Sequence, residues 1–277
     1  MSQKPVSFAK WQANQSGFML SRGGRDWTLQ LDGERPGLHA ADNSDDLVLC
    51  LDGIAAAGRI DPGAFSSQWL VGVEHDSHQI EATFAPGGWN GLDIRARWSL
   101  AARYEGLDLE VQVSARSVGE LKAVELFVTT RLSGPGAEMS RPQPSWVQPR
   151  DPRSAALSYD GREPAGVLAR LTTLPVPLSL EAEFGQVVAR GPEVPGGPYI
   201  ELAHRHDVAR RIVQGEESRP ILGDRLIIRY GLFGHDLEKG VVVRGRLRGI
   251  WVSKGDRDLL PQAAFHEFMA EPPPLAR

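Results

Sequence analysis

The sequence predicts an all-β protein, a large antiparallel β-sandwich, and three observations lead to this fold class. Apolar and polar residues alternate with a period of two through much of the chain. The 30 glycines and 20 prolines supply turns for many short strands. No helical pattern longer than about ten residues interrupts the alternation, which argues against βαβ units and a parallel sheet.

The chain has 277 residues, 41% of them hydrophobic, so it can bury a sizeable core. All-β sandwiches of this length can fold as one domain, and we expect a single domain over residues 1–277 with roughly fifteen strands. The net charge is −4 and the isoelectric point is about 6.0. Nucleic-acid-binding domains are usually strongly basic, so we expect no nucleic-acid partner.

The N-terminus and the single cysteine bear on location and redox chemistry. The opening residues MSQKPVSFAKWQ hold no apolar signal core, and no apolar run approaches membrane-spanning length. We therefore expect a cytoplasmic protein with no membrane partner. Cys50 lies in the apolar run LVLCL, which predicts a short buried strand with an inert thiol. The chain contains no Gly-rich phosphate loop, CxxC or HExxH motif, so we expect no cofactor.

The strongest β pattern runs from Leu92 to Leu132. Three alternating runs, at 92–100, 107–113 and 124–132, are separated by residues typical of turns. We interpret them as an antiparallel meander with one buried face. Trp98 follows the buried alternation and is expected in the core.

Further elements are expected on both sides of this meander. Residues 17–31 predict a hairpin that turns around Gly23-Gly24. Residues 226–233 and 241–252 predict the last strong strand pair, joined by a turn at 234–240. Residues 262–269 predict one short helical turn.

The segment 133–164 breaks the β pattern. It contains six prolines and little periodic hydrophobicity. Such a long connection is unusual inside a compact domain. It is a functional loop, an ordered excursion or a disordered segment, and the sequence leaves these three interpretations open.

The stretch Gly106–Ser114, followed by Ser117 and Val124–Val128, resembles a strand unit of the galactose-mutarotase-like supersandwich. Aldose 1-epimerases and domains of several sugar-processing enzymes have this fold. The resemblance implies a supersandwich that binds carbohydrate on a concave sheet face. Epimerases usually carry a histidine near the second strand of this unit, whereas the corresponding VELFV has none. The resemblance therefore assigns neither the epimerase base nor that activity, and a fold does not fix a function.

His204 and His206 form the sharpest polar cluster, in the sequence His204-Arg205-His206-Asp207. In a strand, both side chains would point to one face. Two imidazoles at this spacing supply acid/base groups, and we take them as the candidate catalytic residues. They can also chelate a metal in the manner of a cupin, which requires a third ligand. Alternatively, they end an apolar face and bind backbone or acidic groups.

Arginines follow one face of each of the last two predicted strands. Arg244, Arg246 and Arg248 share a face, as do Arg225 and Arg229. If these strands pair, the guanidinium groups gather on one surface. Arginine binds carboxylates and phosphates with two parallel hydrogen bonds, so the first three are candidate substrate-binding residues for an acidic ligand. Alternatively, they form a solvated face paired with neighbouring acidic residues.

Two tryptophans are candidate sugar-binding residues. An aromatic ring packs well against the C–H groups of a sugar. Trp89 follows Gly87-Gly88 and is expected to be exposed at a strand end. Trp146 lies in the Pro-rich segment, where it either pins that segment to the body or faces a ligand.

These observations favour a carbohydrate-binding or carbohydrate-processing protein, with an acidic or phosphorylated sugar as the small-molecule partner. If it is an enzyme, we expect acid/base chemistry of the epimerase, lyase or hydrolase type. One alternative is a non-enzymatic binding or assembly protein, which would self-associate through its sheets. A third interpretation is a cupin-like metal-dependent enzyme.

Overall fold

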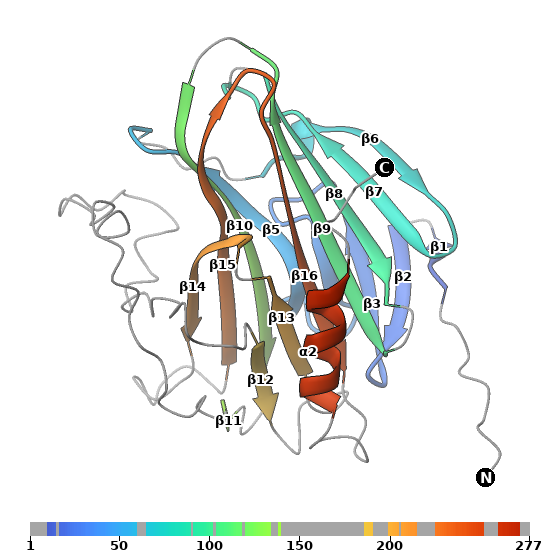
Figure 1. Ribbon diagram of the computed structural model, residues 1–277. Coiled ribbons are helices and arrows are strands. Elements are labelled where there is room, and N and C mark those ends of the chain that lie inside the picture. Colours follow the sequence, from blue (N-terminus) through green and yellow to red (C-terminus); the bar gives the residue numbers. More distant parts are fainter. Residues whose placement is uncertain are drawn as a thin grey trace.

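The computed structural model describes residues 10–14, 17–59, 65–89, 91–101, 104–117, 120–133, 138–139, 186–190, 199–204, 206–214, 225–251 and 260–271. These residues form two 8-stranded antiparallel sheets that pack face to face (Figure 1). The predicted all-β antiparallel sandwich is confirmed. That it belongs to the galactose-mutarotase-like supersandwiches stays a prediction.

Sheet A contains, in spatial order, β1 (Gln12–Asn14), β2 (Gly17–Arg22), β3 (Arg25–Gln30), β4 (Gly37–Ala40), β5 (Leu47–Ala55), β10 (Glu120–Ser133), β15 (Arg225–Glu238) and β14 (Val208–Gln214). Sheet B contains, in spatial order, β11 (Glu138–Met139), β12 (Gln186–Arg190), β13 (Tyr199–Ala203), β16 (Val242–Trp251), β9 (Gly106–Ala115), β8 (Leu92–Leu100), β7 (Gln79–Phe84) and β6 (Leu70–His75). The described helical elements are the 3-10 turn η1 (Ser67–Trp69) and the α-helix α2 (Leu260–Ala270).

The main core lies between the two sheets. Along β9, Leu107, Leu109, Val111 and Val113 are buried in this core, while the residues between them turn to the opposite face. Burial of each such side chain stabilises the fold by about 1.5–3 kcal/mol. Trp98 is in the core, as predicted, and its indole N–H donates to the Leu49 carbonyl of the other sheet at 3.1 Å.

The meander prediction is correct for the strands and wrong for one pairing. β8 and β9 pair with each other, but the chain then crosses to sheet A, where β10 lies between β5 and β15. A period of two identifies the buried face of a strand. It cannot identify the sheet, because both sheets turn apolar residues toward the same core.

The expected pairing of the last two long strands is also wrong. β15 belongs to sheet A and pairs with β10, whereas β16 belongs to sheet B and pairs with β9. The two strands follow each other in sequence, but the turn between them passes from one sheet to the other. Arg229 and the three arginines of β16 therefore do not share a surface.

Two local predictions are confirmed. The β2–β3 hairpin turns at Gly23 and Gly24, whose φ angles of 59° and 71° suit glycine. Cys50 is fully buried, and this burial raises the pKa of its thiol well above the ordinary value.

Helix α2 covers part of the outer face of sheet B, in front of β16 and β13 (Figure 1). A second apolar cluster lies beneath it, formed by Ile200, Leu202, Ile250, Ala264, Phe265 and Phe268. The prediction of helical structure at 262–269 is confirmed, but the element is an α-helix of 11 residues and therefore longer than the single turn expected. No helix in the described part of the chain has the length and apolarity needed to span a membrane. Apart from Ser133 and β11, the Pro-rich segment 133–164 lies outside the described residues.

Candidate functional site

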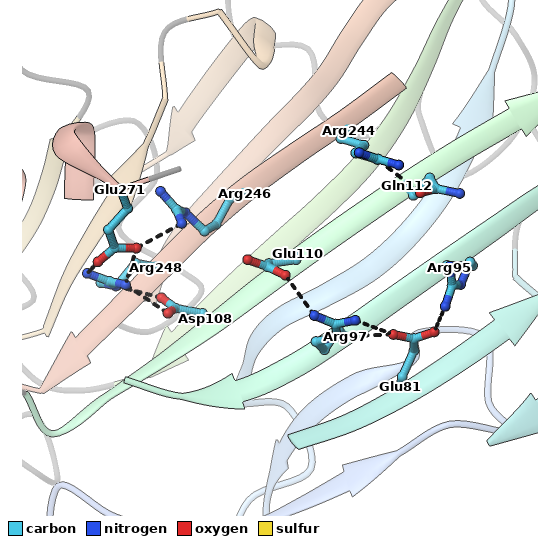
Figure 2. A network of polar contacts seen from close by, with 10 residues as sticks. All are labelled: Glu81, Arg95, Arg97, Asp108, Glu110, Gln112, Arg244, Arg246, Arg248 and Glu271. Atoms are coloured by element: carbon cyan, nitrogen blue, oxygen red, sulfur yellow. Dashed lines mark hydrogen bonds and ion pairs between the residues drawn. The ribbon is translucent and has the colours of Figure 1, made fainter. Parts of the chain in front are cut away.

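A band of charged side chains, together with the polar Gln112, crosses the outer face of sheet B (Figure 2). We call it the charged band; it consists of Glu81, Arg95, Arg97, Asp108, Glu110, Gln112, Arg244, Arg246, Arg248 and Glu271. Its positions follow from strand register, because Glu81, Arg97, Glu110 and Arg246 lie opposite one another on β7, β8, β9 and β16. Acids and bases therefore alternate across neighbouring strands, where opposite charges stabilise the pairing.

The end of the band on β7 and β8 is neutralised internally. Arg97 Nη2 lies 2.8 Å from Glu81 Oε2, and Arg97 Nη1 lies 3.4 Å from Glu110 Oε2. Arg95 also pairs with Glu81. These ion pairs tie three strands together on their solvent side.

The opposite end of the band holds the end of helix α2 against the sheet. Arg248 binds Asp108 with two parallel hydrogen bonds of 2.6 and 2.8 Å, and its Nη1 lies 2.9 Å from Glu271 Oε1. Arg246 Nη1 lies 2.8 Å from Glu271 Oε2, and Arg246 Nη2 donates to the Phe268 carbonyl at 3.0 Å. Glu271, directly after α2, thus forms ion pairs with two guanidinium groups.

Burial and charge shift the pKa values of Asp108 and Arg248 in defined directions. Burial raises the pKa of Asp108 above its ordinary value, although the hydrogen bonds from Arg248 oppose that shift. Burial disfavours the charge of Arg248, but its hydrogen bonds to Asp108 and Glu271 outweigh this effect and raise its pKa. Arg248 therefore stays fully cationic and acts as a structural clamp.

The arginine stripe predicted on β16 thus divides into two kinds of residue. Arg246 and Arg248 are buried, at 6% and 4% exposure, and neither forms a solvated face. Arg244 is exposed, and its Nε donates to Gln112 Oε1 at 3.1 Å. Among the three predicted substrate-binding arginines, Arg244 is the one that reaches solvent.

The two predicted histidines lie in the turn where the chain leaves sheet B for sheet A. β13 ends at Ala203, so the histidines are not on a strand face as the sequence argument assumed. Their rings nevertheless lie 5.3 Å apart, between centroids, with a 36° tilt. The His206 backbone N–H donates to His204 Nδ1 at 3.4 Å.

Asp207 joins the turn that carries His204 and His206, which we call the histidine turn, to β16. Its Oδ1 lies 4.0 Å from His204 Nδ1, and its Oδ2 accepts the backbone N–H of Arg246 at 3.1 Å. Burial raises the pKa of Asp207, while the Arg246 N–H and His204 oppose the shift. The turn therefore offers two imidazoles and a carboxyl group with an elevated pKa. We call His204, His206, Asp207 and Arg244 the candidate site.

Asp207 is the member of this site whose role the sequence did not indicate. The side chain takes the β16 hydrogen-bond position that β13 leaves vacant after Ala203, where Ala203 pairs with Leu247. A strand that ends in a short polar turn indicates that a side chain of the turn can accept such a backbone hydrogen bond. Which neighbouring strand donates that bond depends on the tertiary register.

The tryptophan predictions have different outcomes. The expectation that Trp89 is exposed is wrong, because its side chain is 2% exposed and the guanidinium carbon of Arg59 lies 4.1 Å from its ring centre. It packs in the core and is not presented to a ligand in this arrangement. Trp146 lies outside the described residues, and its role stays a prediction.

A metal centre finds no support in the described residues. They contain no group of three or more histidine, cysteine, aspartate or glutamate side chains arranged to hold an ion. The cupin-like interpretation needs a third ligand near His204 and His206, and the described part of the chain does not provide one.

Comparisons with known proteins identify no family. No protein-family model matches the chain, and no curated protein matches it. Among solved structures, the GH36 alpha-galactosidase AgaB from Geobacillus stearothermophilus is similar over 87% of this chain and 41% of its own length, with 10% sequence identity and a TM-score of 0.31. The chain thus spans less than half of that enzyme, and similarity at this TM-score assigns no function.

Proposed function

We propose that the protein binds a carbohydrate with an anionic group at the candidate site, and that the histidine turn carries out acid/base chemistry on it. The observation that carries the proposal is the hydrogen bond between Asp207 and Arg246. It links the histidine turn to the strand that bears the exposed Arg244. The histidine turn and strand β16 are therefore in direct contact.

The histidine turn has the groups that proton transfer requires. An imidazole can act as an acid or a base close to neutral pH. Asp207 lies on the Nδ1 side of His204 and would stabilise its imidazolium form. In this proposal His204 and His206 exchange protons with the substrate, and Asp207 positions His204.

Arg244 and its neighbours suit the anionic and hydroxyl groups of a sugar acid or sugar phosphate. The guanidinium of Arg244 would pair with the carboxylate or phosphate. Gln112, its hydrogen-bond partner, offers an amide to sugar hydroxyl groups. Arg246 and Arg248 are excluded from direct binding in this proposal because they clamp Glu271.

The test is a thermal-shift titration with glucose, glucuronate and glucose 6-phosphate at constant ionic strength. A ligand that binds only the folded state increases the free energy of unfolding by mass action, by about 2.7 kcal/mol at a hundredfold excess over Kd, and so raises the midpoint. We expect one of the anionic sugars to stabilise the protein more than glucose does. Losing a charge-assisted hydrogen bond costs about 1.5–3 kcal/mol, so Arg244→Met should weaken this binding at least tenfold.

Two matched variants control this experiment. His206→Ala should reduce the response, whereas His78→Ala, at an exposed turn remote in sequence, should retain it. Arg116→Met removes a charge that pairs with Asp93, outside the candidate site, and should also retain it. Equal responses in wild type, Arg244→Met and His206→Ala would reject the proposal.

The assembly alternative has one specific observation in its favour. β6 is the last strand of sheet B in the described part of the chain, and its Val71 and Val73 are 61% and 39% exposed. An exposed edge strand with apolar side chains is a template for pairing with another strand. A mass above that of the monomer in light scattering, without any sugar response, would favour this alternative.

A further inference from the structure

The outer face of sheet A carries a second set of interacting side chains, on the other side of the sandwich from the charged band. We call it the sheet A cluster; it consists of Arg35, Asp52, Glu125, Phe127, Thr129, Arg210 and Arg229. Thr129 lies opposite Arg229 on the neighbouring strand, and Phe127 lies opposite Gly231. The register therefore brings residues of β5, β10, β14 and β15 to one place.

Asp52 is fully engaged within this cluster. Its Oδ1 accepts from Arg35 Nε at 2.9 Å, and its Oδ2 accepts from the Thr129 hydroxyl at 2.8 Å. Arg229 Nη2 lies 3.3 Å from the same Oδ2. Asp52 therefore uses Nη2 of Arg229 and leaves the other two guanidinium nitrogens to other partners.

Phe127 forms an aromatic support for two guanidinium groups. The guanidinium carbon of Arg229 lies 4.5 Å from its ring centre, and that of Arg210 lies 5.1 Å away. Both strand neighbours of Phe127 are glycines, Gly53 and Gly231, so no adjacent side chain crowds the ring on this face. A Cβ added at Gly231 would lie 2.9 Å from Arg210 Cγ, so the observed position of Arg210 depends on a glycine at this residue.

Arg229 has hydrogen-bond donors that the described residues leave unused. Its side chain is 5% exposed, yet Nε and Nη1 have no hydrogen-bond partner in the described part of the chain. Arg210 Nε is in the same situation, although Arg210 Nη2 pairs with Glu125 at 2.6 Å. Buried donors are normally satisfied, and a bound molecule is one way to satisfy them.

The charges of the cluster indicate what kind of molecule fits. Arg35, Arg210 and Arg229 carry three positive charges, and Asp52 and Glu125 carry two negative charges. The cluster has an excess of one positive charge around the buried guanidinium of Arg229, whereas the side chains of Arg35 and Arg210 are 32% and 36% exposed. A ligand group with a single negative charge would balance it.

We propose that the sheet A cluster is a binding site for a carboxylate group of a small molecule, held by Arg229 and Arg210 over Phe127. A carboxylate oxygen accepts charge-assisted hydrogen bonds from guanidinium N–H groups such as Arg229 Nε or Nη1 and Arg210 Nε. This site is distinct from the candidate site on sheet B and does not depend on the proposed function. A phosphate, which carries more than one negative charge near neutral pH, matches the charge of the cluster less well.

The experiment is a thermal-shift titration with sodium acetate and inorganic phosphate, with chloride adjusted to keep ionic strength constant. Wild type should show a saturable rise in midpoint with acetate that exceeds the rise with phosphate. Arg229→Met should abolish the acetate response, and Arg210→Met should weaken acetate binding at least tenfold. Arg116→Met, an equal change of charge outside the cluster, should keep the wild-type response.

Each outcome decides the proposal. No saturable acetate response in wild type, or an equal response in wild type and Arg210→Met, overturns it. A larger response to phosphate overturns the carboxylate assignment. If Arg229→Met fails to fold, the more exposed Arg210→Met decides, together with Gly231→Ala, which should displace Arg210 and also weaken the response.

Discussion

The outer faces of the two sheets both carry buried arginines, but they satisfy them differently. On sheet B, Arg248 has carboxylate partners on both sides, Asp108 from the neighbouring strand and Glu271 from the end of α2. On sheet A, Arg229 shares Asp52 with Arg35 and Thr129 and keeps two nitrogens unused within the described residues. A buried arginine with complete partners is a clamp, whereas one with incomplete partners is a candidate binding group.

This difference predicts unequal costs for removing the two guanidinium groups. Arg248→Met should destabilise the protein by about 3–5 kcal/mol, because it leaves Asp108 buried without its main partner. The measurement is the free energy of unfolding in urea. The double variant Arg248→Met/Asp108→Leu should recover much of the lost stability, since it also removes the buried carboxylate that would lack its partner. No recovery in the double variant would contradict the clamp interpretation.

The same change on sheet A should cost much less. Arg229→Met leaves Asp52 with Arg35 and Thr129, and it removes two donors that have no partner in the described residues. We expect a change within about 1 kcal/mol in urea unfolding without added ligand, because the lost ion pair is offset by removing unsatisfied donors. A loss equal to that of Arg248→Met would show that the two faces are alike and would weaken the case for a ligand.

Much of the sandwich could be predicted from local sequence. Alternation along β8, β9 and β10 correctly identifies the buried face of each strand, and Gly23-Gly24 correctly identifies a hairpin turn. These features depend on neighbouring residues only. The sheet to which β10 or β16 belongs depends on long-range pairing, and an identical alternation serves either sheet.

The candidate site shows the same limit. The sequence indicates His204, His206 and the arginines of β16 as polar groups, but the role of each depends on distant partners. Arg248 meets Asp108, 140 positions away, and becomes a clamp. Arg244 meets Gln112 at the surface and remains accessible. The sheet A cluster is harder still to foresee, because Glu125, Phe127 and Thr129 resemble the ordinary solvent side of a strand.

A smaller effect that separates the two faces is the pH dependence contributed by Glu125. Burial raises the pKa of this carboxyl above its ordinary value of 4.5, although Arg210 and Arg229 oppose the shift. The folded protein therefore binds more protons than the unfolded chain between 4.5 and the raised pKa. Stability contributed by this group is present below that window and declines as pH rises through it.

Glu125→Gln should remove this decline. The free energy of unfolding of wild type relative to Glu125→Gln should fall as pH rises above 4.5 and then level off. Urea unfolding at a series of pH values measures the difference, with Glu74→Gln on the exposed strand β6 as the matched control. Bound acetate adds a negative charge beside Glu125 and should extend the decline to higher pH, since a second carboxylate nearby disfavours the ionised form. An opposite slope would mean that the guanidinium groups outweigh burial and lower the pKa of Glu125 in the folded protein.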